Sequence, residues 1–132
     1  MASRRTSCGT GMETLLLDAD GTLYPCLNTN RPEFAFGNVR EVGFEFGRAW
    51  RTSPMLERIR RETSVEAVES ACADCVVKYW CLGGCHGETY AAGGSLNARS
   101  PDCAELRSAV TEMMWTLSSR PGWIREVRPA FC

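Results

Sequence analysis

The sequence predicts a small α+β domain stabilised by metal, with an N-terminal β-hairpin, long loops, short helices and a C-terminal helix. Three observations favour this class. The chain has 132 residues, about the length of one domain. It opens with two apolar runs around turn residues and closes with apolar residues at helical spacing. It has eight cysteines, too few for their number alone to indicate a disulfide scaffold, yet four of them lie within one short loop.

The hairpin is predicted to consist of two apolar strands, residues 13–17 and 22–25, joined by a turn that ends at Gly21. Glycine supplies the positive φ that such a turn requires. Cys8 precedes the first strand and Cys26 follows the second. A hairpin would bring these two thiols together, so we expect a metal-binding corner at its base.

The same hairpin contains a second pattern. Asp18, Asp20 and Thr22 resemble the first motif of the haloacid dehalogenase phosphatases, in which the first aspartate attacks phosphorus and the second handles the leaving-group proton. That fold also needs a downstream lysine on a doubly wound parallel sheet. The only lysine is Lys78, in a cysteine-rich loop, and no alternation of strands and helices follows residue 26. A turn between two strands is the preferred interpretation, and a phosphatase fragment remains a distant alternative.

The middle of the chain is predicted to be a long connection followed by two short helices. Residues 27–52 are rich in glycine and asparagine but also in aromatic residues, which favours ordered packing over disorder. Ser53 and Pro54 are typical of a helix start, with serine as the cap. Residues 63–66 match a capping box, so we expect a second helix that leads to Cys72.

The last helix is predicted to begin after Ser100, Pro101 and Asp102. Its apolar residues fall at helical spacing on one face, and we expect that face to be core: Leu106, Val110, Met113 and Leu117. Cys103 would lie in the first turn, where free amide groups and the helix dipole favour a thiolate.

The strongest chemical signal is a cysteine loop with the spacing C-x2-C-x5-C-x3-C, formed by Cys72, Cys75, Cys81 and Cys85. Such spacing gathers soft thiolate ligands, and the glycine pair 83–84 lets backbone amides approach the sulfurs. The spacing indicates a metal or cluster but leaves its identity open. One alternative is a structural or interaction domain in which these four residues close a tetrahedral zinc site.

His86, the only histidine, is adjacent to this loop. The thiols already supply enough donors, so we expect His86 to be hydrogen-bonded or exposed rather than a ligand.

Composition indicates in which cellular compartment the protein works and which classes of binding partner are not expected. The basic N-terminus has no apolar run behind it, so it is not typical of a secretory signal, and no apolar stretch is long enough to span a bilayer. We therefore expect a cytoplasmic protein, where clustered cysteines more often hold metal than form disulfides. The net charge of −1 gives no reason to expect a nucleic acid or a membrane as partner.

Taken together, the cysteines resemble a known family. Cys8, twelve residues, Gly21, four residues and Cys26, then the cysteine loop and Cys103, resemble the seven-cysteine signature of the SPASM domain. This domain is the C-terminal extension of radical S-adenosylmethionine (SAM) enzymes that modify peptides and proteins. The resemblance implies an extension at 1–7, a domain with two clusters at 8–120 and a tail at 121–132.

The resemblance also implies two auxiliary 4Fe-4S clusters and a division of ligands between them. The second cluster would be bound by Cys72, Cys75, Cys81 and Cys103, and the first by Cys8, Cys26 and Cys85. The cysteine loop would then serve both clusters, as in two-cluster ferredoxins, and would tie the hairpin, the loop and the last helix together.

Two departures from the family pattern limit what this chain does alone. Residues 1–7 contain no fourth cysteine for the first cluster, so its last iron has an open position, a ligand from outside this chain, or Cys132. The C-x3-C-x2-C motif that binds the SAM-cleaving cluster is also missing, since Glu88 stands three residues after Cys85. We expect a module without catalysis of its own that serves electron transfer and substrate positioning. Its partners would be a radical SAM core domain, in the same parent chain or a separate subunit, and a peptide or protein substrate.

Overall fold

The predicted hairpin is present, but its strands are shorter than the predicted ranges 13–17 and 22–25. The computed structural model describes residues 6–68 and 72–123. In it, β1 (Leu16–Leu17) pairs antiparallel with β2 (Thr22–Tyr24). The turn between them closes with the Gly21 N–H donating to the Asp18 carbonyl at 2.9 Å, and Gly21 has φ +91°. The glycine is required there because an L side chain rarely adopts this conformation.

A third strand, β3 (Gly37–Asn38), pairs antiparallel with β2 and gives the sheet order β1-β2-β3. This strand is not among the predicted elements, since it lies in the region predicted to be a connection, residues 27–52. They also contain two short 3-10 helices, η1 (Leu27–Thr29) and η2 (Pro32–Phe34), and the helix α1 (Phe46–Thr52). The prediction of a mere connection was therefore wrong in this respect.

Aromatic contacts explain the ordered structure in this region. Trp50 in α1 stacks on Phe46 with ring centroids 5.8 Å apart, and meets Phe36 edge-on at 6.1 Å. The guanidinium of Arg60 lies 5.6 Å from the Trp50 ring centroid and donates to its carbonyl at 2.8 Å. These contacts hold α1 against the next helix, because the aromatic rings gain both burial and favourable edge or face geometry.

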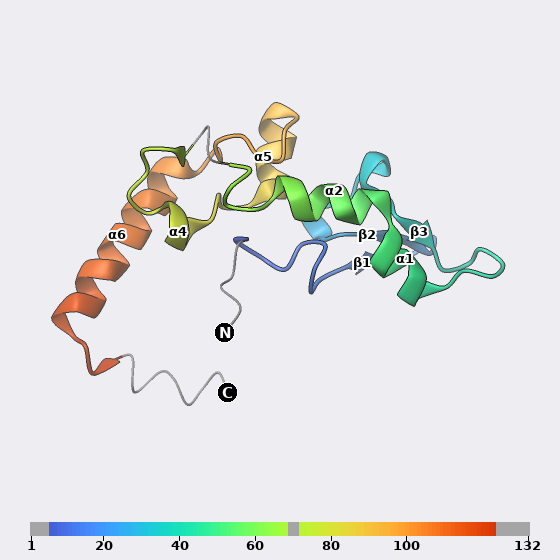
Figure 1. Ribbon diagram of the computed structural model, residues 1–132, viewed down its shortest axis with the longest axis horizontal. Coiled ribbons are helices and arrows are strands. Elements are labelled where there is room, and N and C mark those ends of the chain that lie inside the picture. The colour runs from blue at the N-terminus through green and yellow to red at the C-terminus, as the bar shows by residue number, and fades with distance from the viewer. Residues whose placement is uncertain (1–5, 69–71, 124–132) are drawn as a thin grey trace.

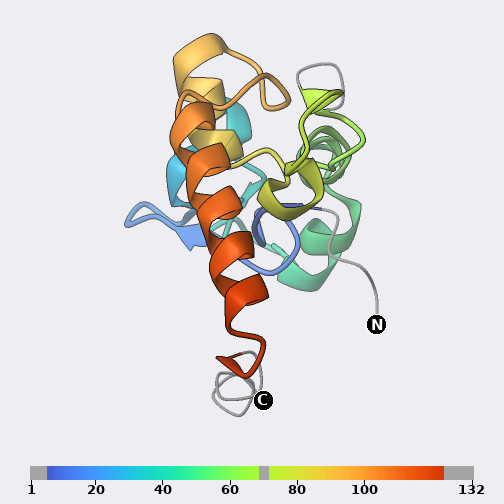
Figure 2. The same ribbon diagram turned by 90° about the vertical axis from the view of Figure 1, so that its left-hand side faces the viewer.

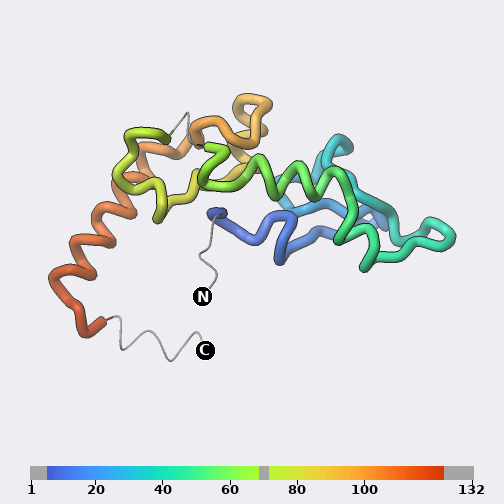
Figure 3. The backbone as a smooth tube through the Cα atoms, in the orientation of Figure 1, coloured from blue at the N-terminus to red at the C-terminus, as the bar shows by residue number. Residues whose placement is uncertain are grey.

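The helix α2 (Pro54–Glu62) begins where the sequence predicts. The Ser53 hydroxyl accepts a hydrogen bond from the Leu56 N–H at 3.4 Å, and Pro54 occupies the first turn, where its missing N–H costs nothing. Arg60 also donates from Nε to the carbonyl of Gly11 at 2.8 Å. Figure 3 shows the N-terminal segment running alongside α2 toward the sheet, consistent with this bond.

The capping box predicted at residues 63–66 does not form. The Thr63 hydroxyl donates back to the Ile59 carbonyl at 2.8 Å and finishes α2, while Ser64 accepts from the Ala67 N–H at 3.2 Å. The prediction of Thr63 as an N-cap was wrong. A threonine hydroxyl can donate to a carbonyl of the preceding helical turn, and here it does so. Part of the helix expected next, residues 69–71, lies outside the described residues.

The core joins the hairpin to α2 and to the second half of the chain. Its buried members are Tyr24, Phe34, Ile59 and Leu96, with Leu16, Met55 and Tyr90 packed around them. Phe34 is fully buried and meets Tyr90 edge-on at 4.6 Å. This cluster unites segments that are far apart in sequence, so it positions the hairpin against the region that follows the cysteine loop.

The second half of the chain contains, among its described residues, the helices α4 (Lys78–Cys81), α5 (His86–Gly93) and α6 (Cys103–Ser119). Figure 1 shows an elongated molecule with the sheet and α1 toward one end and α6 at the other. No residue of α6 is buried, and Met113 and Trp115 are exposed. The prediction that one face of this helix is core was therefore wrong. The helix packs on α4 and projects beyond it (Figures 1 and 2).

The α+β class, the N-terminal hairpin, the short helices and the C-terminal helix are thus confirmed. In the described part of the chain, no helix is long and apolar enough to cross a membrane.

Candidate metal centre

Four thiols from two separated parts of the chain line one small pocket. They belong to Cys72, Cys75, Cys81 and Cys103. The first two lie before α4, the third ends α4 and the fourth begins α6. The Cys75 N–H donates to the Cys72 carbonyl at 3.0 Å, which closes the turn between the first two cysteines. These are the four residues that the sequence resemblance groups together.

Cys85, the last cysteine of the loop, is not among the residues that line this pocket. The chain turns away through three successive residues with positive φ: Leu82 (+55°), Gly83 (+93°) and Gly84 (+73°). Two of the three are glycines, which adopt this conformation without strain, and this is the physical use of the glycine pair. The turn leaves Cys81 at the pocket and carries Cys85 to the start of α5, where it is the N-cap.

The pKa of Cys72 is set by its burial and by its charged neighbours. Burial raises the pKa of Cys72, and the charges of Cys75, Cys103 and Cys81 raise it further, while Arg99 acts in the opposite direction. All four thiols are half-buried. Without a bound cation, four thiolates at these positions would repel one another, because like charges disfavour ionisation of their neighbours.

The donor set fits an iron–sulfur cluster by its chemistry. It consists of four thiols and no carboxylate or imidazole from the described residues, and soft thiolates are the usual ligands of such clusters. Over residues 6–68 and 72–123, no three His, Cys, Asp or Glu side chains form a group that could hold a metal ion. The four thiols therefore line the pocket, but no three of them are grouped around a single metal-ion position.

A second corner brings together the segments that carry Cys8, Cys26 and Cys85. The Ser7 hydroxyl donates to the carbonyl of Gly84, which places the Cys8 segment against the residue that precedes Cys85. On the other side, the Asn28 side-chain amide donates to the Cys85 sulfur at 3.2 Å. These two bonds bring the three segments close together, and the shared cluster of Cys8, Cys26 and Cys85 stays a prediction.

Hydroxyl groups support the other two thiols of this corner. The Cys8 sulfur lies 3.0 Å from the Thr10 hydroxyl oxygen. The Thr29 hydroxyl accepts from the Cys26 N–H at 3.0 Å. Its oxygen also lies 3.0 Å from the Cys26 carbonyl oxygen and 3.4 Å from the Cys26 sulfur, either of which can accept its proton. These contacts help to fix the orientation of the two sulfurs. Cys132, the remaining candidate ligand, lies outside the described residues.

Sequence reasoning missed these supporting polar side chains. Asn28 and Thr29 lie two and three residues after Cys26, and Ser7 precedes Cys8, so their only signal was a position near a predicted ligand. Asparagine, serine and threonine are also common in turns, so the sequence did not distinguish a contact with a thiol from an ordinary turn.

The corner depends on close backbone contact between α5 and η1. Gly87 in α5 faces Asn28, and a Cβ at Gly87 would stand 2.6 Å from the Asn28 carbonyl oxygen. We expect Gly87→Ala to separate α5 from η1 and to lower the free energy of unfolding by about 1–3 kcal/mol, because the obstacle is backbone that has to shift. Thermal or urea unfolding monitored by circular dichroism measures this effect.

Gly93→Ala is the matched control, since it lies in the same helix and a Cβ there would meet nothing within 4 Å. It should leave stability unchanged or slightly higher. Equal destabilisation by the two substitutions would contradict the close contact at Gly87.

His86 is hydrogen-bonded, as expected, but it is not exposed. Its ring is 1% exposed, and Nδ1 lies 2.8 Å from the Leu96 carbonyl oxygen. Burial lowers the pKa of His86, although the backbone groups of Leu96 and Thr63 oppose this shift. Its Nε2 atom is buried and has no hydrogen-bond partner among the described residues. His86 therefore acts as a neutral core residue that anchors the segment after α5.

The two aspartates of the phosphatase-like pattern serve the hairpin turn. Asp18 accepts from the Ala19 N–H at 2.7 Å, and Asp20 accepts from the Thr22 N–H at 2.8 Å. The bonds from the Thr22 backbone and side chain lower the pKa of the exposed Asp20 carboxyl. The described sheet is three-stranded and antiparallel, unlike the parallel sheet that the phosphatase motif requires. A turn role accounts for both carboxylates.

The fold, the four-thiol pocket and the second thiol corner define a small metal-binding α+β domain. A scan against protein-family models matches residues 8–76, just over half of the chain, to SPASM, an iron-sulfur cluster-binding domain. The chain therefore belongs to the SPASM family. A search of curated proteins found no match.

Proposed function

We propose that this chain binds two 4Fe-4S clusters and acts as the SPASM module of a radical SAM enzyme that modifies a peptide or protein. The observation that carries the proposal is the gathering of four thiols around one pocket, together with a second corner where three further cysteine segments meet. Family membership adds that the domain binds iron–sulfur clusters.

The residues divide between the two proposed clusters as follows. Cys72, Cys75, Cys81 and Cys103 hold the second cluster, and Cys8, Cys26 and Cys85 hold the first. When bound, the clusters supply one-electron transfer. The chain's own part is to hold each cluster between elements that the core already positions, and to donate hydrogen bonds to its sulfurs, as Asn28 does to Cys85.

The partner in this proposal is a radical SAM core domain, in the same polypeptide or in a separate subunit, and the working compartment is the cytoplasm. The core domain would supply the SAM-cleaving cluster, for which this chain has no C-x3-C-x2-C motif. The chain itself would then contribute electron transfer and substrate positioning, with no catalysis of its own.

Anaerobic purification followed by iron and acid-labile sulfide counting tests the proposal. We expect a brown protein with about eight iron and eight sulfide per chain, because each 4Fe-4S cluster contributes four of each. Colourless, sulfide-free protein that retains zinc would overturn the proposal in favour of a structural zinc domain. About four iron and four sulfide per chain would mean that the protein binds one cluster and that the proposal of two clusters is wrong.

A further inference from the structure

Basic side chains surround the four-thiol pocket. Lys78 and Arg107 are among the residues that line it, and the charge of Arg99 acts on the Cys72 thiol. Lys78 is the only lysine in the chain.

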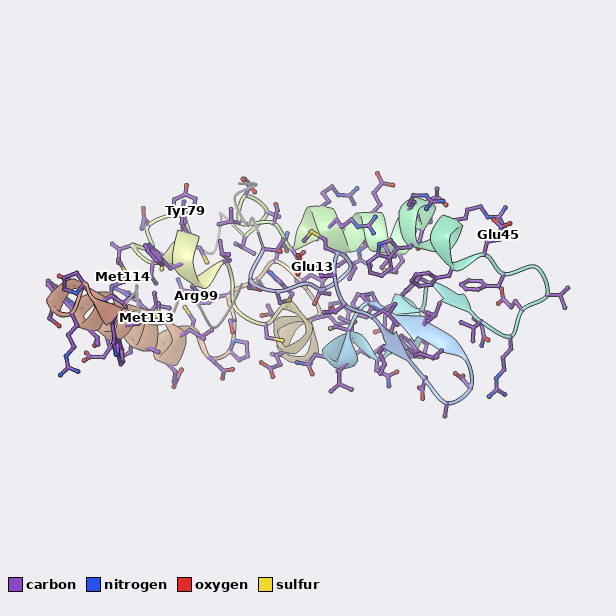
Figure 4. All side chains as sticks on the ribbon, turned by 90° about the horizontal axis from the view of Figure 1, so that it is seen from below. Glu13, Glu45, Tyr79, Arg99, Met113 and Met114 are labelled. Carbon is purple, nitrogen blue, oxygen red and sulfur yellow. The ribbon has the colours of Figure 1, made fainter. Side chains whose placement is uncertain are left out.

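The three cations come from three different parts of the chain. Lys78 begins α4, three residues before Cys81, and its Nζ donates to the Ala73 carbonyl at 3.4 Å. Arg107 lies in α6, one turn after Cys103, on the same side of that helix. Figure 4 shows Arg99 between α4 and the start of α6. A negative charge in the pocket would therefore be approached by cations from several directions.

Acidic residues occur near the same segments but occupy other positions. Asp74, Asp102 and Glu105 are exposed, and no carboxylate among the described residues lines the pocket. The charges that border the pocket itself are thus positive.

On the basis of the proposed function, we propose that Lys78, Arg99 and Arg107 form a cationic rim that raises the reduction potential of the cluster at the four-thiol site. A 4Fe-4S cluster with four thiolate ligands is negatively charged, and uptake of one electron from a one-electron donor makes it more negative. No bond breaks and no proton moves in this step. The cations attract the reduced form more strongly than the oxidised form, so they favour reduction.

Potentiometric titration with dithionite, followed by electron paramagnetic resonance, tests this proposal on the full chain. The signal that disappears in Cys103→Ala identifies the cluster at the four-thiol site. At the midpoint potential of the unmodified chain, Arg107→Gln and Lys78→Gln should each lower the ratio of reduced to oxidised cluster by about threefold at low salt. High salt should shrink these differences, because it screens partly exposed charges.

Two variants serve as controls. Arg107→Lys keeps the charge and should keep the potential, and Arg120→Gln removes a charge at the opposite end of α6 and should leave the potential unchanged. If the clusters form with normal iron content and neither Arg107→Gln nor Lys78→Gln shifts the potential, the inference fails while the proposed function stands. If no cluster forms in the unmodified chain, the proposed function fails first.

Discussion

Replacing Cys85 by alanine is expected to lower the iron content and the melting temperature of the protein together. Cys85 is a proposed ligand of the first cluster, and it begins α5 directly after the loop that carries the other thiols. Its sulfur also accepts the hydrogen bond from Asn28 that joins η1 to α5. Loss of this thiol should remove about half of the iron and weaken the attachment of the N-terminal segment and η1 to the rest of the chain.

The measurement combines iron analysis with thermal unfolding followed by circular dichroism under anaerobic conditions. The metal-free forms of the variant and the unmodified chain provide the control, since without a cluster the substitution removes little more than one hydrogen bond. Their melting temperatures should differ far less than those of the loaded forms. A loaded variant that melts like the unmodified chain would argue against the shared role of the cysteine loop.

Replacing Cys103 by alanine should free α6 from the body of the domain. No residue of α6 is buried, and the helix packs on the short helix α4. Most of the stability of a helix in a protein comes from tertiary packing, and no residue of this 17-residue helix is buried, so the bond from Cys103 to the second cluster should supply much of what orders it. We expect loss of about half of the iron, a clear fall in helical content, and faster proteolysis within α6.

Far-ultraviolet circular dichroism and limited proteolysis, each with the iron analysis, measure these changes. Ser108→Ala is the matched control, because it alters an exposed residue of the same helix and touches no proposed ligand. Retention of full helical content and protease resistance in an iron-depleted Cys103→Ala protein would show that α6 does not depend on the cluster.

Local signals in the sequence were sufficient for several elements. The Asp18 to Gly21 turn predicted the hairpin, because Gly21 alone supplies the required positive φ. Ser53 and Pro54 predicted the start of α2, because a cap acts within one turn of the chain. In each case the interaction partners lie within a few residues of one another, so the sequence order contains the whole interaction.

The elements that the sequence missed depend on distant contacts. Helix α1 follows from the contacts of Trp50 with Phe36, Phe46 and Arg60. In α6, the helical period predicted which residues share a face, but the period contains no information on whether another element covers that face. The exposed Met113 and Trp115 show that, within the described residues, none does so fully.

For the metal centre, the sequence by itself determined that this is an α+β chain with a hairpin and a loop of closely spaced thiols suited to a soft metal or cluster. Spacing did not decide which thiols share a pocket: the family resemblance implied a grouping, and the tertiary structure shows which four thiols line one pocket. Spacing alone left Cys85 as a possible fourth member beside Cys72, Cys75 and Cys81, whereas the structure has Cys103 in that place. The reason is that residues 82–84 turn the chain through positive φ, while α4 and α6 pack together and bring in Cys103 from beyond the loop.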